Sequence, residues 1–233
     1  VSFAPQLREQ LEKSGMEQLE HVIVDGDVET SANKNINDIA GTPAGTETFL
    51  LFDGFRKLPL VTNTANSRSA SGAFVVEDFK NTAKLLGVAG LAAADPRQVA
   101  FIIDYNTMWA AMDLPELKTR DVSARATLEN GVLTRVYNIP VINSYQMHLK
   151  APATVERLAN TSGKVDVDTA GNNTTGAILA VRFDQWKIAY KRRMTMEVTR
   201  LARSDSWEIV ALMRFGLAYR DTEASAISYN VGV

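Results

Sequence analysis

The chain has 233 residues, with 25 basic side chains, 27 acidic side chains and a formal net charge of −2 at pH 7. The absence of cysteine excludes a disulfide scaffold, thiol catalysis and zinc sites built on cysteine. The slightly negative charge is the wrong balance for a protein whose affinity depends on neutralising phosphates. No apolar stretch approaches the roughly 20 residues of a membrane-spanning helix, so we expect no membrane contact.

The clearest predicted element is a helix over residues 5–25. Its apolar residues recur at multiples of four positions, at Leu7, Leu11, Leu19 and Ile23. This spacing draws one apolar stripe along a helix. Opposite charges stand one turn apart on its other faces, at Arg8–Glu12, Glu9–Lys13 and Lys13–Glu17. A helix of about 22 residues extends roughly 33 Å, a length suited to a spine that supports other elements.

Polar segments separate the pieces that follow. Residues 31–47 are rich in Asn, Thr and Gly and lack periodicity, which indicates a loop. The segment 47–58 is apolar, and we predict a short helix ended by Pro59, because proline disfavours helix in the residue before it. The polar segment 62–72 then marks a boundary between two lobes.

Helices and strands alternate from residue 76 onward. Apolar spacing and a following glycine predict a helix over 76–86. The continuous apolar run 98–104 is typical of a strand covered on both faces. We expect Asn106 to cap a further helix, and an Asn-Gly turn at 130–131 to open a segment with two short strands that are broken at Pro140. This alternation implies a small α/β lobe.

The last part of the chain predicts a sheet with one exposed face. After a loop over 163–176, a short apolar strand occupies 177–181. Apolar and polar residues alternate in 193–200, and the apolar segment 204–231 supplies a long partner strand. The long helix and the last strands therefore form one lobe, and the alternating middle forms another.

The catalytic inventory is poor. His21 stands four residues before Asp25 and six before Asp27, a spacing that permits a metal site, although a histidine at a helix end beside solvated carboxylates is the simpler interpretation. His148 has no acid at ligand spacing. We therefore predict no catalytic, cofactor-binding or metal residue. A small α+β hydrolase acting near His148 and Asp104 is the alternative from another class.

One basic cluster stands out, formed by Lys187, Lys191, Arg192 and Arg193. Such a cluster can blunt the edge of a strand and so discourage aggregation. It can also form a socket for carboxylates of a neighbouring copy, which arginine binds in a bidentate manner. The long helix with its acidic side chains is a candidate for that neighbour. The residues alone leave both interpretations open.

The order of several phrases carries a resemblance to a known family. In chain order they are a long N-terminal helix ending in DGD, then FDGFRKL, DPRQVAFIIDYNTMWAAMDLPELKTRD, NIPVINSYQM, RFDQWKIAYKRRMTMEV and IVALMRFGLAYRDTEASAISYNV. Together they resemble the major capsid protein of tailed bacteriophages, which has the Hong Kong 97 fold. The resemblance covers nearly all of the chain.

The resemblance implies an α+β fold, in which a flat, two-lobed subunit has a long spine helix, an antiparallel peripheral sheet and an α/β axial lobe. The peripheral lobe would comprise residues 1–62 together with a sheet formed by 186–220. The axial lobe would comprise 63–185, and residues 221–233 would return to it. The family's N-terminal arm and extended hairpin are absent from the sequence as given, so nothing supports covalent cross-linking.

A major capsid protein would assemble with copies of itself, as pentamers and hexamers, into an icosahedral shell around double-stranded DNA. Portal, scaffold and cement proteins would be further partners, and contact with packaged DNA would be non-specific. The protein would be assembled in the bacterial host cytoplasm and would reside in the virion. The nearest rival is an encapsulin-like compartment, which shares the fold and encloses cargo enzymes instead of a genome.

The predicted subunit-interface residues are charged side chains on two elements. They are Glu9, Glu12 and Glu17 on the helix, Lys191, Arg192 and Arg193 in the basic cluster, and Arg214 and Arg220 in the last long strand. The function would then depend on rigid contacts between copies, without a reactive group or a cofactor.

Overall fold

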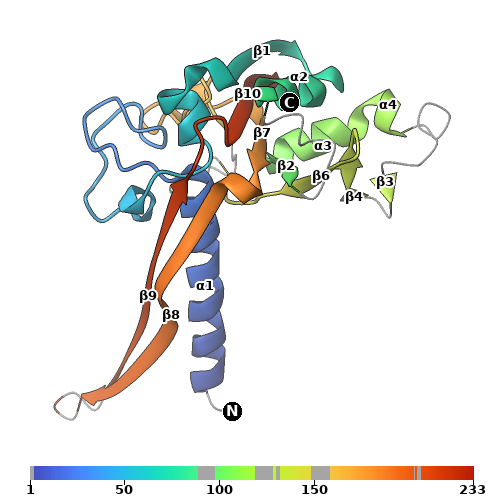
Figure 1. Ribbon diagram of the computed structural model, residues 1–233. Coiled ribbons are helices and arrows are strands. Elements are labelled where there is room, and N and C mark those ends of the chain that lie inside the picture. Colours follow the sequence, from blue (N-terminus) through green and yellow to red (C-terminus); the bar gives the residue numbers. More distant parts are fainter. Residues whose placement is uncertain are drawn as a thin grey trace.

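The computed structural model describes residues 3–88, 98–118, 128–129, 132–147, 158–201, 203 and 206–233. It has a mixed α+β fold with two visibly different parts (Figure 1). One part is a six-stranded sheet with short helices packed against it. The other consists of one long helix and one long two-stranded ribbon, which extend side by side away from the sheet (Figure 1).

The long helix α1 covers Phe3–Asp25 and confirms the helix predicted for residues 5–25. Only its C-terminal part enters the core, where Leu19, Val22 and Val24 are buried. The segment after Phe52 runs back along this end, because the backbone N–H groups of Phe55 and Arg56 donate to the carbonyls of Ile23 and Val24, both at 2.9 Å. The last carbonyls of a helix have no partner within the helix, so the returning segment supplies hydrogen bonds to these two.

The helix predicted over 47–58 is wrong. The structure has a short 3-10 turn η1 at Thr48–Leu51 and a separate helical turn η2 at Leu58–Thr62, which contains Pro59 instead of ending before it. Proline is tolerated in the first turn of a helix because its missing N–H has no partner there. Between the two turns the backbone passes close to α1, and a Cβ on Gly54 would lie 2.6 Å from the nitrogen of Gly26.

The six-stranded sheet has the order β1-β10-β7-β2-β6-β5. Its strands are β1 (Ser67–Ala73), β2 (Val99–Ile103), β5 (Arg135–Val136), β6 (Ile139–Asn143), β7 (Thr175–Arg182) and β10 (Ser225–Gly232). The pairs β1–β10 and β2–β6 are parallel, and the other pairs are antiparallel. Every residue of β2 is buried, which confirms the strand predicted over 98–104.

Short helices pack against this sheet and bury its core. They are α2 (Glu77–Leu85), α3 (Tyr105–Asp113) and α4 (Pro115–Lys118), followed by the strand pair β3 (Leu128–Glu129) and β4 (Val132–Leu133). The helix predicted over 76–86 is confirmed by α2, whose Phe79 contacts Phe101 with ring centroids 5.1 Å apart. This contact joins the helix to the central strand.

The prediction that Asn106 caps the next helix is wrong, because Asp104 is the cap of α3. Its carboxylate accepts hydrogen bonds from the backbone N–H of Thr107 at 2.9 Å and of Ala177 at 3.0 Å, so it also ties the helix to β7. Aspartate and asparagine are both favoured at this position. Asp104 occupies the cap position because the buried strand β2 ends at Ile103 and α3 begins at Tyr105.

The predicted break at Pro140 is also wrong, because Pro140 lies inside β6. A tight turn at Tyr137 and Asn138, both with positive φ, joins β5 to β6 and places Pro140 opposite Arg135. The second residue of a strand tolerates proline when its missing N–H is not needed by a neighbouring strand. The Asn-Gly turn expected at 130–131 lies outside the described residues.

The ribbon consists of β8 (Trp186–Leu201) and β9 (Ser206–Tyr219), paired antiparallel along almost their whole length. A strand of 16 residues extends about 50 Å. The tip of the ribbon and the N-terminal end of α1 lie at the same end of the molecule, far from the six-stranded sheet (Figure 1). Among the described residues, no helix is both long and apolar enough to span a membrane.

Candidate assembly surface

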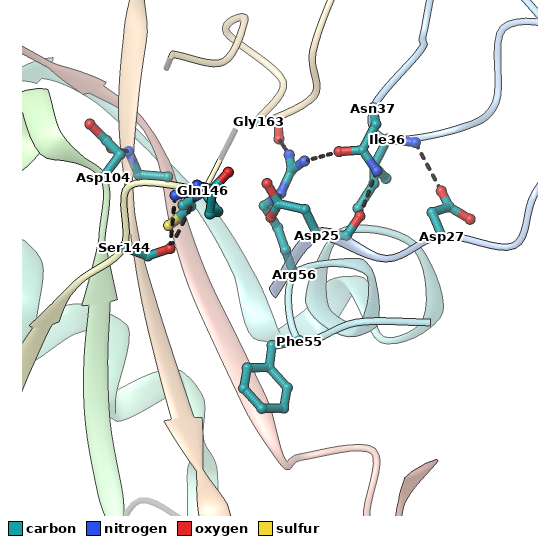
Figure 2. A network of polar contacts seen from close by, with 12 residues as sticks. Asp25, Asp27, Ile36, Asn37, Phe55, Arg56, Asp104, Ser144, Gln146 and Gly163 are labelled. Carbon is teal, nitrogen blue, oxygen red and sulfur yellow. Dashed lines mark hydrogen bonds and ion pairs between the residues drawn. The ribbon is translucent and has the colours of Figure 1, made fainter. Parts of the chain in front are cut away.

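A buried ion pair lies where the two parts of the molecule meet. The side chains of Arg56 and Asp25 are fully buried, and the arginine Nε donates to the carboxylate at 2.7 Å. The other guanidinium nitrogens donate to the carbonyl of Gly163 and to the side-chain oxygen of Asn37, the latter at 2.9 Å (Figure 2). Asn37 in turn donates to the backbone carbonyl of Asp25. Four segments distant in sequence are therefore held together by one arginine.

A second ion pair lies beside the first. Lys57 reaches Asp27 at 2.6 Å and Asp53 at 2.8 Å. The carboxylate of Asp27 also accepts from the backbone N–H groups of Ile36, at 2.8 Å, and Glu29, at 2.9 Å. The loop predicted over 31–47 is thus held by the Asp27 carboxylate, which lies two positions after the end of α1.

The ribbon is rooted in the same region. Phe55, the neighbour of Arg56, contacts Trp186 at the start of β8 with ring centroids 4.7 Å apart. The carbonyl of Phe55 accepts from the hydroxyl of Ser225 at 2.9 Å, which joins it to β10. Trp186 also contacts Tyr219 at the end of β9, at 5.5 Å. Both projecting elements, α1 and the ribbon, therefore start from one buried cluster.

Beyond this root the ribbon is largely exposed. Its exposed large apolar side chains are Ile188, Tyr190, Val198, Leu201, Trp207, Val210, Leu212 and Tyr219. The exposed fraction reaches 65% for Trp207 and 57% for Val198. So many exposed large apolar side chains on one element indicate that the ribbon contacts another molecule.

The two projecting elements carry opposite charge. Within α1 there are five acidic and two basic side chains. Within β8 and β9 there are six basic side chains, Lys187, Lys191, Arg192, Arg193, Arg200 and Arg214, and two acidic ones, Glu197 and Glu208. Surfaces of opposite sign on one subunit allow copies to attract one another.

The predicted glutamates are all exposed on α1. Glu12 pairs with Arg8 at 3.0 Å on its own helix. By helical spacing Glu12 lies about 60° from Glu9 around the helix axis, whereas Glu17 lies about 140° from Glu12. The three residues therefore do not form one cluster, although each is accessible to another copy.

The predicted basic residues lie at different heights along the ribbon. Arg192 stands directly opposite Arg214, and its guanidinium pairs with Glu197 on the same strand. The register of the ribbon shifts on both sides of Arg192, so the strand bulges at the basic cluster. Lys191 and Arg193 are exposed there. Like charges placed opposite one another are unfavourable within one sheet, and here the Glu197 carboxylate offsets part of the charge of the arginine pair.

Arg220 lies apart from the others, at the root of the ribbon. It follows directly after β9, and its backbone N–H donates to the carbonyl of Gln185 at 2.8 Å. Its side chain is exposed. Arg214 and Arg192 are brought together by the structure, whereas Arg220 is separated from them along the strand.

An apolar groove between α1 and the ribbon was not anticipated from the sequence. It has a volume of about 170 Å³ and is lined by residues of α1, η1, β8 and β9, among them Leu19, Leu51, Met194 and Phe215. The side chain of Met194 approaches α1 at Gly15, where a Cβ would lie 2.5 Å from the methionine methyl carbon. A glycine in the middle of a strong helix pattern is the one sequence signal that could have indicated this approach.

His21 is buried at the base of α1, and its Nε2 has no hydrogen-bond partner among the described residues. The ring lies edge-on to Phe49 of η1, with centroids 6.2 Å apart. Burial lowers the pKa of His21, against the attraction of the nearby Asp25 and Glu47 carboxylates, and the Arg56 charge lowers the pKa further. The ring therefore packs as a neutral group.

The metal interpretation of His21 finds no support in the arrangement of its neighbours. Asp25 and Asp27 are engaged by Arg56 and Lys57. In the described part of the chain, no group of three or more side chains is placed to hold a metal ion. The hydrolase alternative named His148 and Asp104. His148 lies outside the described residues, and Asp104 caps α3. Burial raises the pKa of the Asp104 carboxyl, whereas the hydrogen bonds donated by Thr107 and Ala177 lower it.

No protein-family model and no curated protein matches this chain. Solved structures do resemble it. The holo-SrpI encapsulin complex from Synechococcus elongatus PCC 7942 matches with a TM-score of 0.55 and 15% identity, over 99% of this chain and 66% of that chain. The satellite phage P4 procapsid including size determination (Sid) protein matches with a TM-score of 0.45 and 12% identity, over 100% of this chain and 69% of that chain. Mycobacterium phage Che8 matches with a TM-score of 0.46 and 12% identity, over 76% of this chain and 57% of that chain.

These structural neighbours are longer than the chain, which spans between 57% and 69% of their lengths. At 15% identity the likeness to the encapsulin is a likeness of fold. The chain therefore has a mixed α+β fold like that of this encapsulin, with one long helix and one long ribbon outside its core.

Replacing the buried arginine tests the root of the assembly surface. We expect Arg56→Ala to lower the free energy of unfolding by about 3 to 5 kcal/mol, because it leaves the Asp25 carboxylate buried without its cation. Arg56→Lys should cost less, since an ammonium still neutralises the charge. Urea unfolding followed by circular dichroism measures both. Arg8→Ala, which breaks the exposed pair with Glu12, is the control and should cost at most about 0.5 kcal/mol.

The buried histidine predicts a dependence of stability on pH. The pKa of His21 in the folded chain is lower than its ordinary value of 6.5. The stability due to its neutral form is therefore fully present above pH 6.5 and is lost as the pH falls below that value toward the folded pKa. Urea unfolding between pH 7.5 and pH 5 should show a smaller loss for His21→Phe than for the wild type. Parallel curves for the two proteins would contradict this role.

Proposed function

We propose that the chain is a structural shell subunit, the major capsid protein of a tailed bacteriophage or prophage. Many copies would assemble into an icosahedral head that encloses double-stranded DNA. The observation that carries the proposal is the long exposed ribbon beside a long, mostly exposed helix, both projecting from a core whose fold is shared with an encapsulin shell protein. Such elements bury little surface within their own subunit, so they suit contacts between subunits.

The Hong Kong 97 fold is the finer assignment that we propose. In it α1 is the spine helix, the ribbon is the peripheral sheet, and the six-stranded sheet with its helices is the axial lobe. The proposed division is 1–62 and 186–220 for the peripheral lobe, and 63–185 with 221–233 for the axial lobe. The return of β10 to the six-stranded sheet, between β1 and β7, supports this division.

Charged contacts would hold neighbouring copies together. Glu9, Glu12 and Glu17 are exposed on the acidic helix, and Lys191, Arg193 and Arg214 are exposed on the basic ribbon. A contact between helix and ribbon of different copies is heterologous, since it uses two different surfaces of the subunit, and contacts of this kind repeat around rings and closed shells. At the bulge Arg214 stands opposite Arg192, which pairs with Glu197, so the two guanidinium groups would be shared by this carboxylate and one from another copy.

The other partners follow from the proposed role. A phage head would require a portal and a scaffold, and cement proteins would bind its outer surface. Contact with packaged DNA would be non-specific, through backbone phosphates and basic side chains such as those of the ribbon. The chain would be assembled in the cytoplasm of the bacterial host and would remain in the virion.

An encapsulin-like compartment is the second candidate. It is favoured by one observation, the TM-score of 0.55 over 99% of the chain with the encapsulin of Synechococcus elongatus. The genes beside the coding sequence distinguish the candidates. Terminase and portal genes support the phage head, whereas an adjacent gene for a cargo enzyme supports the compartment.

Electron microscopy of the purified chain tests the proposal. We expect closed shells of uniform diameter in negative stain at micromolar concentration and moderate salt. Light scattering after size exclusion should give a mass of many tens of subunits. A monomer at all concentrations and salt conditions would contradict a shell-forming role.

Reversing the charge of the basic cluster tests its part in assembly. Arg192→Glu combined with Arg193→Glu should raise the protein concentration needed for assembly by about tenfold or more, because carboxylates of the neighbouring copy are then repelled. The circular dichroism spectrum of the subunit should be unchanged. Lys80→Glu combined with Lys84→Glu, on α2, is a control with the same change in charge. If the ribbon variant forms normal shells, the basic cluster is not part of the interface.

A further inference from the structure

We infer that one stripe of α1 on one copy binds the tip of the ribbon on another copy. We call the stripe Glu9, Glu12, Met16 and Glu20 the helix stripe, and the residues Val198, Arg200 and Trp207 the ribbon tip. The inference rests on the proposed function, since it names a contact through which the shell subunits associate. It adds two apolar anchors to the charged contacts proposed above.

The helix stripe is defined by its spacing. Glu12 follows Glu9 by three positions, and Met16 and Glu20 each follow by four more, so all four residues share one face of α1. All four are exposed, and Met16 has 59% exposure. This face lies to the side of the groove that packs Gly15 and Leu19 against the ribbon. Lys13 follows Glu9 by four positions and lies on the same side, so the stripe presents one apolar side chain among three carboxylates and one ammonium.

The ribbon tip has the complementary composition. Trp207 stands directly opposite Arg200, and Val198 lies two positions before Arg200 on the same face. Trp207 is the most exposed large apolar residue of the ribbon, at 65%. An apolar pair beside a cation is thus placed near the far end of a ribbon about 50 Å long. Figure 1 shows this end extending well away from the six-stranded sheet.

The two surfaces fit one another in charge and in apolar contact. Arg200 is positive, whereas Met16 lies among the carboxylates of Glu9, Glu12 and Glu20, with the single ammonium of Lys13 on the same side. Met16 and Trp207 would form the dry centre, where a thioether against an aromatic ring is favourable and a charged rim excludes water. Tryptophan is also among the residues that most often dominate the energy of an interface. Because the two surfaces are different, one subunit carries both, and the contact repeats from copy to copy.

Disulfide trapping tests this contact directly, because the chain has no cysteine of its own. The double variant Met16→Cys with Trp207→Cys should form a ladder of covalent oligomers under mild oxidation, seen on a non-reducing gel. A mixture of the two single variants should form covalent dimers only, which shows that the bond joins different copies. Each single variant alone should give less than about a tenth of this product.

The matched control is Ser14→Cys with Trp207→Cys. Ser14 is exposed on α1, but it lies about 160° around the helix axis from Met16. It should therefore give at most about a tenth of the cross-linked product, since two cysteines join only when their Cα atoms approach within about 7 Å. Equal cross-linking from Ser14 and Met16 would overturn the inference.

Truncating the anchor gives a second measurement. Trp207→Ala should raise the concentration for half-assembly by about thirtyfold, as expected when a dominant aromatic contact is lost. Val210→Ala, on the opposite face of the same strand, should change it by less than about threefold. Thermal unfolding of the subunits confirms that both variants are folded.

The outcomes separate this contact from the proposed function. If the wild type forms shells and the Met16–Trp207 disulfide does not form, the contact is wrong and the shell role stands. If the wild type forms no shell, the proposed function fails, and absence of the disulfide then overturns the contact as well. Shells together with the specific disulfide support both.

Discussion

The buried ion pair between Arg56 and Asp25 fixes how the rest of the molecule is arranged. An unpaired charge in such a place would be very costly, so the arginine must keep all of its partners together. Those partners are the end of α1, the loop at Asn37 and the loop at Gly163. The adjacent Phe55 extends the same cluster to Trp186 at the base of the ribbon. The direction in which both projecting elements leave the core is thereby set at one point.

The projecting elements themselves have little support from their own subunit. A two-stranded ribbon is marginally stable when isolated, and most helices depend on packing of an apolar face. Here α1 meets the ribbon through a groove at Gly15 and Met194, near the middle of α1 and of β8, while the ribbon tip stays exposed. A subunit of this form is rigid at its base and incomplete at its edges. Association with further copies would complete it.

The sequence could predict the elements whose pattern is local. The four-residue spacing in α1 and the uninterrupted apolar run of β2 each indicate one structure over one segment, and both are confirmed. The segment 47–58 could not be predicted in this way. Its backbone bonds to the end of α1 at Ile23 and Val24, and hydrophobic periodicity carries no information on a partner so distant in sequence.

The candidate surface was predictable in composition and not in geometry. Charge alone indicates that the helix is acidic and the ribbon basic. It could not indicate that Arg192 stands opposite Arg214, because the register depends on two bulges. Nor could it reveal the buried role of Arg56, whose partner Gly163 lies 107 positions away. Helical spacing shows on which face of α1 each glutamate lies. It does not show which surface of another copy covers that face.

The central claim is that α1 and the ribbon are covered by neighbouring copies. Hydrogen exchange measured by mass spectrometry on the assembled and the unassembled chain tests it most directly, because it reports protection segment by segment. The account predicts that peptides from the first half of α1 and from β8 and β9 become strongly protected on assembly, while β2 and β7 are protected equally in both states. Unchanged exchange in the ribbon of an assembled particle would contradict it.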